Sequence, residues 1–194
     1  GGGRVGEPGV NNRELQNTRA PLGSPYAPDP ASQKVSTMGG NIGENSGGPH
    51  CLKYGVTTNH VRGFEMVLPN GEVIHTGGPC EDNPGYDITG TVVASEGTLG
   101  VVTAMTLRIM RVPEAIKTML AVFDTLEDAG DAVSAIIADG IIPATLEIMD
   151  NTVIQAVEAS CNSGYPRDAA EVLIGARDGV WEGAERQAGG RGET

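Results

Sequence analysis

The part of this chain best suited to binding is a run of glycine, asparagine and serine from Thr37 to Gly48. It reads TMGGNIGENSGG, so four of its glycines come in two pairs, with Asn41, Asn45 and Ser46 between them. Glycine lets a backbone turn tightly and aim N–H groups at an anion, while amide and hydroxyl side chains add donors and acceptors. Such a surface suits a large polar cofactor lying along the backbone. A plain glycine-rich loop without a ligand is the alternative that these residues leave open.

A second candidate stretch is Ser95–Val101, which reads SEGTLGV. A helix end here turns through Gly97 and Gly100 into a strand. By itself this pattern indicates only a tight connection between two elements. Residues 95–101 would form part of a binding site only if they face the first stretch. We expect both stretches to line one concavity.

Other common binding motifs are excluded. Residues 1–6 match the letters of GxGxxG, but no strand precedes them and Pro8 with Gly9 would break the helix that must follow. The chain also lacks GxxxxGK[ST], HExxH and GxSxG. The three cysteines are widely separated and show no metal-ligand spacing, so we assign no metal site and no catalytic residue.

Composition indicates a globular protein that avoids nucleic acid. The chain has 194 residues, of which 39% are hydrophobic and 20% charged, enough to bury a core in one large domain or two small ones. A net charge of −12 repels phosphate backbones and anionic membrane surfaces. No apolar run is long enough to span a bilayer, and the odd cysteine count favours a reducing cytoplasm.

The periodicity of apolar residues predicts the strands and helices around these stretches, and the pattern changes at Pro113. Before it we expect a helix at 12–19, strands at 62–68 and 72–76 joined by an Asn70-Gly71 turn, a helix at 85–94 and a strand at 101–110. After it we expect strands at 116–123, 145–149 and 171–176, with helices between them capped by Thr125 and Asp150. This order predicts an α+β fold whose second part is a split βαβ unit that the chain leaves unfinished.

Together these motifs resemble a known family. The chain carries Pro28-Asp29-Pro30-x-Ser32, the GGNIGENSGG run and SEGTLG at a separation similar to that in the p-cresol methylhydroxylase-type FAD domain of the vanillyl-alcohol oxidase superfamily. The runs HCLKYG at 50–55 and GYD at 85–87 resemble the branch that contains glycolate oxidase and D-lactate dehydrogenase. The resemblance extends over about residues 5–179.

The resemblance implies a domain layout and a cofactor site. It implies the C-terminal part of an FAD-binding domain at 1–113, the start of a ferredoxin-like cap domain at 114–178 and a disordered tail at 179–194. The implied FAD contacts come from two segments and a neighbouring loop: Pro28, Asp29, Pro30, Ser32, Thr37, Gly39, Gly40, Asn41, Gly43, Asn45, Ser46, Ser95, Glu96, Gly97, Gly100 and Val101.

The resemblance also implies an activity. Family members of this branch use FAD to oxidise a small 2-hydroxy acid of the glycolate or D-lactate type. It implies a cytoplasmic enzyme, with attachment to the inner membrane through an iron–sulfur or second flavin subunit left open. One alternative is a non-redox FAD enzyme like alkyl-dihydroxyacetone-phosphate synthase.

The chain departs from the family pattern at both ends. No residue matches the family's first glycine-rich FAD loop, its metal-binding histidines or its substrate base. Another alternative is therefore a truncated, non-catalytic chain, and we expect residues 1–194 alone neither to hold FAD tightly nor to turn over. Covalent tethering of FAD through His50 or Cys51 is a further open alternative.

Overall fold

The computed structural model describes residues 3–78 and 84–179, and the chain divides into two compact units. The first unit runs from Gly1 to Val112 and the second from Pro113 to Thr194. Each unit has its own antiparallel sheet, and the two sheets share no strand. The predicted tail lies outside the described residues from position 180 onward, whereas Gly179 belongs to the last strand.

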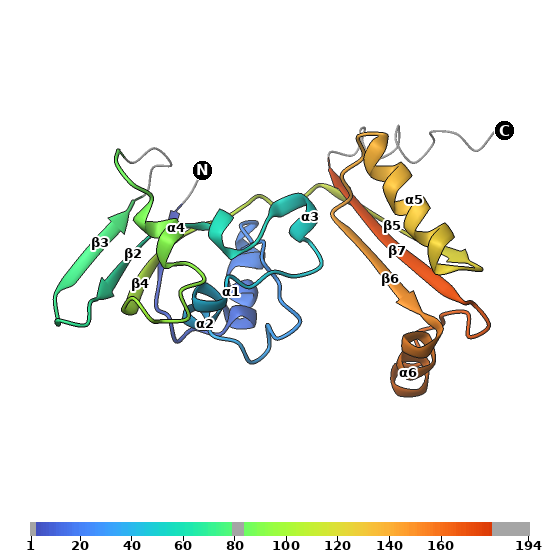
Figure 1. The fold of residues 1–194 in the computed structure, drawn as a ribbon, viewed down its shortest axis with the longest axis horizontal. Coiled ribbons are helices and arrows are strands. Elements are labelled where there is room, and N and C mark those ends of the chain that lie inside the picture. The colour runs from blue at the N-terminus through green and yellow to red at the C-terminus, as the bar shows by residue number, and fades with distance from the viewer. Residues whose placement is uncertain (1–2, 79–83, 180–194) are drawn as a thin grey trace. The chain divides into compact units, whose positions relative to one another are not determined.

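The first unit is built on a four-stranded sheet with strand order β1-β4-β2-β3 (Figure 1). Its strands are β1 (Gly3–Gly6), β2 (Val61–Val67), β3 (Val73–Gly77) and β4 (Val101–Arg108). The predicted β2–β3 hairpin is confirmed, and Gly71 takes the positive φ of 85° that its turn requires. Strand β1 is not predicted by the sequence: it forms by pairing with β4, a distant partner that the local glycine-rich sequence does not reveal.

Short helices cover this sheet. They are α1 (Asn12–Arg19), η1 (Ala20–Leu22), α2 (Met38–Glu44), α3 (Cys51–Tyr54), η2 (Thr57–Asn59) and α4 (Ile88–Val92). Helix α1 has the predicted bounds, and α4 is shorter than expected. Helix α2 corrects the glycine loop expected there. It begins where Thr37 Oγ1 accepts the Gly40 amide at 3.2 Å and ends at Asn45 in the left-handed region.

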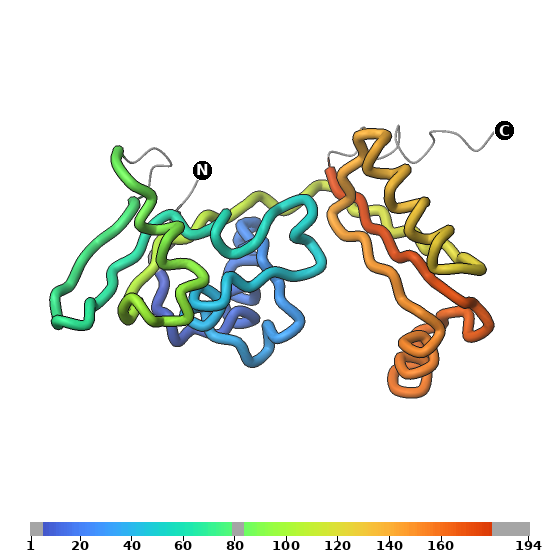
Figure 2. The backbone as a smooth tube through the Cα atoms, viewed as in Figure 1, coloured from blue at the N-terminus to red at the C-terminus, as the bar shows by residue number. Residues whose placement is uncertain are grey.

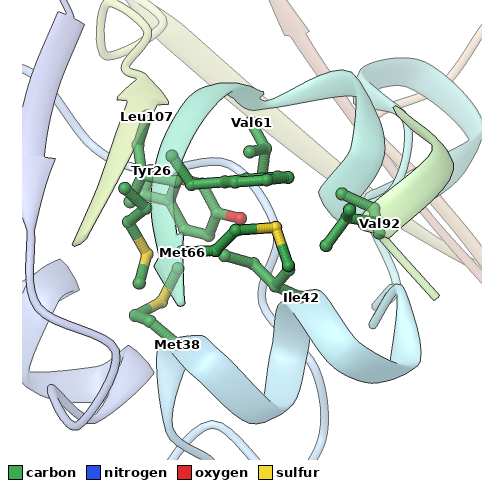
Figure 3. Packing of buried hydrophobic residues seen from close by; sticks show 10 residues of the cluster. Tyr26, Met38, Ile42, Val61, Met66, Val92 and Leu107 are labelled. Atoms are coloured by element: carbon green, nitrogen blue, oxygen red, sulfur yellow. The ribbon is translucent and has the colours of Figure 1, made fainter. Parts of the chain in front are cut away.

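Helix α2 forms despite its glycines because two of its side chains are buried in the core. Met38 and Ile42 are each 1% exposed, and they lie one helical turn apart on the same face. Figure 3 shows both pointing toward Met66 and Tyr26, with Val92 beside them. Burying two large apolar side chains contributes about 1.5–3 kcal/mol each, which exceeds the roughly 1 kcal/mol that each helical glycine costs relative to alanine.

The second unit is a split βαβ arrangement, as the sequence predicted. Its elements are β5 (Ala115–Phe123), α5 (Leu126–Ala138), β6 (Thr145–Asp150), α6 (Asn151–Cys161) and β7 (Glu171–Gly179). Strand β7 lies between β5 and β6 and is antiparallel to both, so β5 and β6 run parallel to each other (Figure 1).

Caps and core contacts hold the two helices of this unit in place. Thr125 Oγ1 accepts the Asp128 amide at 3.1 Å, and Asp150 Oδ1 accepts the Val153 amide at 2.8 Å, which confirms both predicted caps. Helix α6 packs through the fully buried Ile154 against Val172 of β7.

A histidine sits inside the first unit. His60 is 1% exposed, and its Nε2 lies 2.8 Å from the Tyr54 carbonyl oxygen, to which the neutral ring donates. The Tyr26 ring meets it edge-on, with centroids 5.7 Å apart. Burial lowers the pKa of His60, because a charged imidazolium there would lose its hydration, and the nearby Arg108 charge adds to this effect.

We predict that His60 makes the first unit less stable in mild acid. Since its pKa is lowered on folding, the unfolded chain takes up a proton below about pH 6.5 that the folded chain resists, so the free energy of unfolding falls there. His60→Gln, which keeps a donor, should show a smaller fall between about pH 7.5 and 5.5 in urea titrations followed by circular dichroism. His75→Gln is the control because the His75 side chain is 72% exposed. Equal pH dependence in wild type and His60→Gln would refute the prediction.

Candidate functional site

The two predicted binding stretches lie side by side in the first unit (Figure 2). The Ala94 amide donates to the Ile42 carbonyl at 2.9 Å, and the Glu96 amide donates to the Gly43 carbonyl at 3.0 Å. The end of α2 is therefore tied to the turn that leads from α4 into β4. The two stretches are about fifty residues apart in the sequence, yet they are in contact, as expected.

The two stretches line one cavity of about 390 Å³. Seven of the predicted site residues line it: Thr37, Gly39, Gly43, Ser95, Gly97, Gly100 and Val101. On α2, Gly39 and Gly43 lie one turn apart, on a face adjacent to the buried stripe of Met38 and Ile42. Because Met38 and Ile42 pack against the sheet, the neighbouring glycines Gly39 and Gly43 face the cavity.

A third wall comes from residues that the sequence analysis dismissed. Pro8 and Gly9 also line the cavity, and they had been read only as a helix breaker. The Gly39 amide donates to the Pro8 carbonyl at 2.8 Å, and a Cβ on Gly39 would lie 2.9 Å from Pro8 Cβ. Gly39 is therefore required by the packing of the N-terminal segment. The Pro-Gly turn was visible in the sequence, but its contact with α2 was not.

The first backbone amides of α2 already donate to other groups, so this part of the stretch does not aim its N–H groups at an anion as expected. The amide of Met38 donates to Val10, that of Gly39 to Pro8 and that of Gly40 to the Thr37 hydroxyl. These bonds satisfy the amides that a helix start leaves open. Among the described residues, the cavity-lining amides outside helices and strands that have no acceptor are those of Gly9, Thr37, Gly97 and Gly100.

The turn after α4 has an unusual backbone. Ala94 and Glu96 adopt positive φ angles of 69° and 53°, a region that non-glycine residues rarely occupy, and Gly97 follows at 73°. Strained backbone of this kind costs of order 1–3 kcal/mol per residue and clusters at ligand sites. The two backbone bonds to Ile42 and Gly43 help hold this conformation.

Several predicted site residues stabilise the framework of the site and do not line the cavity. Asn45 Oδ1 accepts the Thr58 amide at 2.9 Å, and the Ser46 carbonyl accepts the Thr57 amide at 3.0 Å. Asn41 is 1% exposed, and its Nδ2 has no acceptor among the described residues. Gly40 donates its amide to the Thr37 cap.

The Pro28–Ser32 segment lies away from the cavity lining and packs against the second glycine pair. The Pro28 carbonyl accepts a hydrogen bond from the buried Asn12 side chain at 3.2 Å. Asp29 Oδ2 accepts from His50 Nδ1 at 2.8 Å. A Cβ on Gly48 would lie 2.6 Å from the Asp29 carbonyl oxygen, so that glycine permits a close backbone approach.

The described part of the chain contains neither a candidate metal site nor a candidate membrane-spanning helix. Within residues 3–78 and 84–179, no group of three or more His, Cys, Asp or Glu side chains is placed to hold a metal ion. Over the same residues no helix is long and apolar enough to cross a membrane.

We predict different stability effects at two glycines of the same stretch. Gly48→Ala should destabilise the protein by about 1–3 kcal/mol, because its Cβ would overlap the Asp29 backbone. Gly43→Ala is the matched control: its Cβ would meet Glu96 Cα at an ordinary 3.8 Å, and alanine favours the helix. Urea denaturation measures both. Equal free energies of unfolding for the two variants would contradict this assignment.

Comparison with known proteins gives two family matches, one for each unit. Residues 5–77 match the FAD binding domain, and residues 112–188 match the C-terminal domain of FAD linked oxidases. The chain is 44% identical over 174 residues to glycolate oxidase subunit GlcD of Escherichia coli (strain K12), covering 90% of this chain and 35% of that protein. It is 46% identical over 181 residues to the same subunit of Bacillus subtilis (strain 168), covering 93% and 38%.

Two further comparisons extend this picture. D-lactate dehydrogenase of Anaerostipes hadrus is 32% identical over 170 residues, covering 87% of this chain and 36% of that protein. A solved alkyldihydroxyacetonephosphate synthase superposes with a TM-score of 0.83 at 22% identity, covering 96% of this chain and 37% of that one, a likeness of fold alone. The chain spans little more than a third of the length of these proteins. The chain therefore contains one region similar to the FAD binding domain and one similar to the C-terminal domain of FAD linked oxidases, as its glycolate oxidase relatives also indicate.

Proposed function

We propose that the chain is part of an FAD-dependent oxidoreductase that oxidises a small 2-hydroxy acid of the glycolate or D-lactate type. The observation that carries this proposal is the single cavity formed by the two family motifs, Gly39–Gly43 on one side and Ser95–Val101 on the other. The names of the glycolate oxidase and D-lactate dehydrogenase relatives supply the substrate class.

The lining of this cavity fits part of an FAD molecule. It contains no carboxylate, although the chain carries a net charge of −12, so a pyrophosphate would not meet a like charge there. The amides of Gly9 and Gly97 and the hydroxyl of Ser95 provide donors, while Val101 and Val102 provide apolar surface for a ring. The cavity is smaller than a dinucleotide, so it would hold one portion of the cofactor.

FAD, when bound, would accept the hydride from the hydroxy acid. The residues of this chain would position the cofactor: the glycines would allow close approach of the backbone, and Thr37 and Ser95 would lie at the cavity wall. We assign no substrate base and no substrate-binding arginine. We propose that electrons leave to a partner subunit and that the enzyme works in the cytoplasm. The free thiols of Cys51 and Cys161 among the described residues support the cytoplasmic assignment, because reduced cysteines are usual there.

We further propose the finer domain assignment implied by the family. The first unit would be the second half of a p-cresol methylhydroxylase-type FAD domain, and residues 114–178 would begin a ferredoxin-like cap. The split βαβ order of the second unit supports the cap, because a ferredoxin-like fold contains this unit.

One alternative enzyme has a specific observation in its favour. The fold is similar to that of an alkyldihydroxyacetonephosphate synthase. The family resemblance implies that such an enzyme would use its FAD domain without net oxidation. Sequence identity favours the hydroxy-acid branch, at 44–46% for the glycolate oxidase subunits against 22% for that structure.

We predict weak, saturable binding of FAD to residues 1–194, measured by quenching of FAD fluorescence. Gly43→Leu should weaken it at least tenfold, about 1.4 kcal/mol, because the leucine side chain would occupy the cavity. Gly130→Leu is the control, since a Cβ there meets nothing within 4 Å and the residue lies in the second unit. Circular dichroism checks that both variants fold.

Two results would count against this proposal. If wild type and Gly43→Leu bound FAD with equal affinity, the cofactor would not bind in this cavity. No saturable quenching by the wild-type chain would favour the alternative of a non-binding, truncated chain.

A further inference from the structure

The turn between β2 and β3 contains the one asparagine of this sequence that directly precedes a glycine. Pro69, Asn70 and Gly71 form a three-residue hairpin loop, which is closed by a hydrogen bond from the Leu68 amide to the Glu72 carbonyl at 2.8 Å. All three loop residues are exposed, and none of them lines the candidate flavin cavity. The loop is therefore open to water on the surface of the first unit.

The side chain of Asn70 is held by its neighbour in the turn. Its Oδ1 accepts the Glu72 amide at 3.0 Å, the bond that defines an Asx turn, and its Nδ2 lies 3.4 Å from Glu72 Oε2. These two contacts assign the oxygen and the nitrogen of the side-chain amide. A backbone donor therefore already contacts the oxygen that becomes negative when a nucleophile adds to the amide carbon.

The nucleophile next to this amide along the chain is the backbone nitrogen of Gly71. Its attack on the side-chain carbon of Asn70 closes a succinimide ring, and such an intramolecular step needs no second molecule to be bound. Glycine has no side chain beside the attacking nitrogen, and nothing lies within 4 Å of the position that a Gly71 Cβ would take. Neither a side chain nor another segment crowds this peptide bond.

One hydrogen bond opposes this attack. The Gly71 amide donates to the Leu68 carbonyl at 2.9 Å, and this bond must open before the nitrogen can lose its proton. The bond lies in an exposed loop tip, where local opening costs less than unfolding of the sheet. The reaction therefore requires only a local motion of the turn.

Other asparagines of the described residues are less suited to the same reaction. Asn12 and Asn41 are buried, at 0% and 1% exposed. Asn162 is exposed, but it precedes Ser163, whose side chain stands beside the attacking nitrogen. The combination of an exposed asparagine, an Asx turn and a following glycine is found at Asn70.

From this combination we propose that Asn70 is a site of spontaneous covalent modification, namely deamidation through a succinimide. The bond from the Gly71 nitrogen to Asn70 Cγ forms, the Cγ–Nδ2 bond breaks, and ammonia leaves with the proton that Gly71 loses. Water then opens the ring at either of its two carbonyls. One opening gives aspartate, and the other gives isoaspartate, in which the main chain runs through Cγ. The step needs only water, so it is independent of the proposed FAD site.

The products change the end of the sheet that adjoins the candidate flavin cavity. Both carry a new negative charge beside Glu72, and isoaspartate inserts an extra carbon into the main chain of the turn. Val67, at the end of β2 that leads into this turn, pairs with the cavity-lining Val101. A Cβ on Gly100 would lie 2.7 Å from the Val67 carbonyl oxygen, so this contact leaves little room for a shift of β2.

The test is incubation of the whole chain in mildly alkaline buffer, where more of the Gly71 amide is deprotonated, with peptide mass spectrometry at intervals. We expect Asn70 to lose its amide before any other asparagine, with aspartate and isoaspartate both formed. Isoaspartate is identified by fragmentation of its peptide and by methyl transfer with an isoaspartyl methyltransferase.

Asn162 is the control within the same sample, because it is exposed and precedes serine. Asn70→Gln is the matched variant: it keeps an amide, but its ring would be larger and closes more slowly, so the isoaspartate signal should be lost. Circular dichroism checks that the variant folds. Conversion of Asn162 ahead of Asn70, an unchanged Asn70, aspartate without isoaspartate, or an isoaspartate signal that persists in Asn70→Gln would each overturn the proposal.

Discussion

The burial of Met38 and Ile42 against the sheet is the contact on which the candidate flavin site depends. These two side chains fix the rotation of α2, and a helix whose rotation is fixed presents all its faces in known directions. The adjacent stripe of Gly39 and Gly43 then faces the 94–101 turn, which is bonded to α2 through the Ile42 and Gly43 carbonyls. An apolar contact in the core therefore positions a glycine surface outside it.

The glycines of the two motifs have different tasks that the sequence alone does not separate. Gly48 allows the Asp29 backbone to approach, and Gly39 allows Pro8 to approach. Gly97 takes a positive φ, and Gly43 faces the cavity with only ordinary contacts to the neighbouring turn. A family motif thus combines residues that shape the fold with residues that line the site. Substitutions at these positions should accordingly affect stability and cofactor binding to different degrees.

The sequence predicted those elements that depend on neighbouring residues, such as turns and helix caps. The β2–β3 hairpin follows from Asn70-Gly71, and the starts of α5 and α6 follow from the caps Thr125 and Asp150. Elements that depend on distant partners were missed. Strand β1 exists because β4 pairs with it, and α2 exists because the sheet buries its apolar stripe. For the same reason the meeting of the two motifs was predictable from family resemblance, whereas the third wall at Pro8 and Gly9 was not.

The central claim is that the cavity shared by α2, the 94–101 turn and the Pro8-Gly9 turn receives part of FAD. The most direct test is the amide nitrogen–hydrogen NMR spectrum of the isotope-labelled chain during addition of FAD. If the claim holds, the largest shifts appear among Gly9, Thr37, Gly97 and Gly100, whose amides line the cavity and have no acceptor among the described residues. Saturable shifts confined to other residues, with these four amides unchanged, would contradict it.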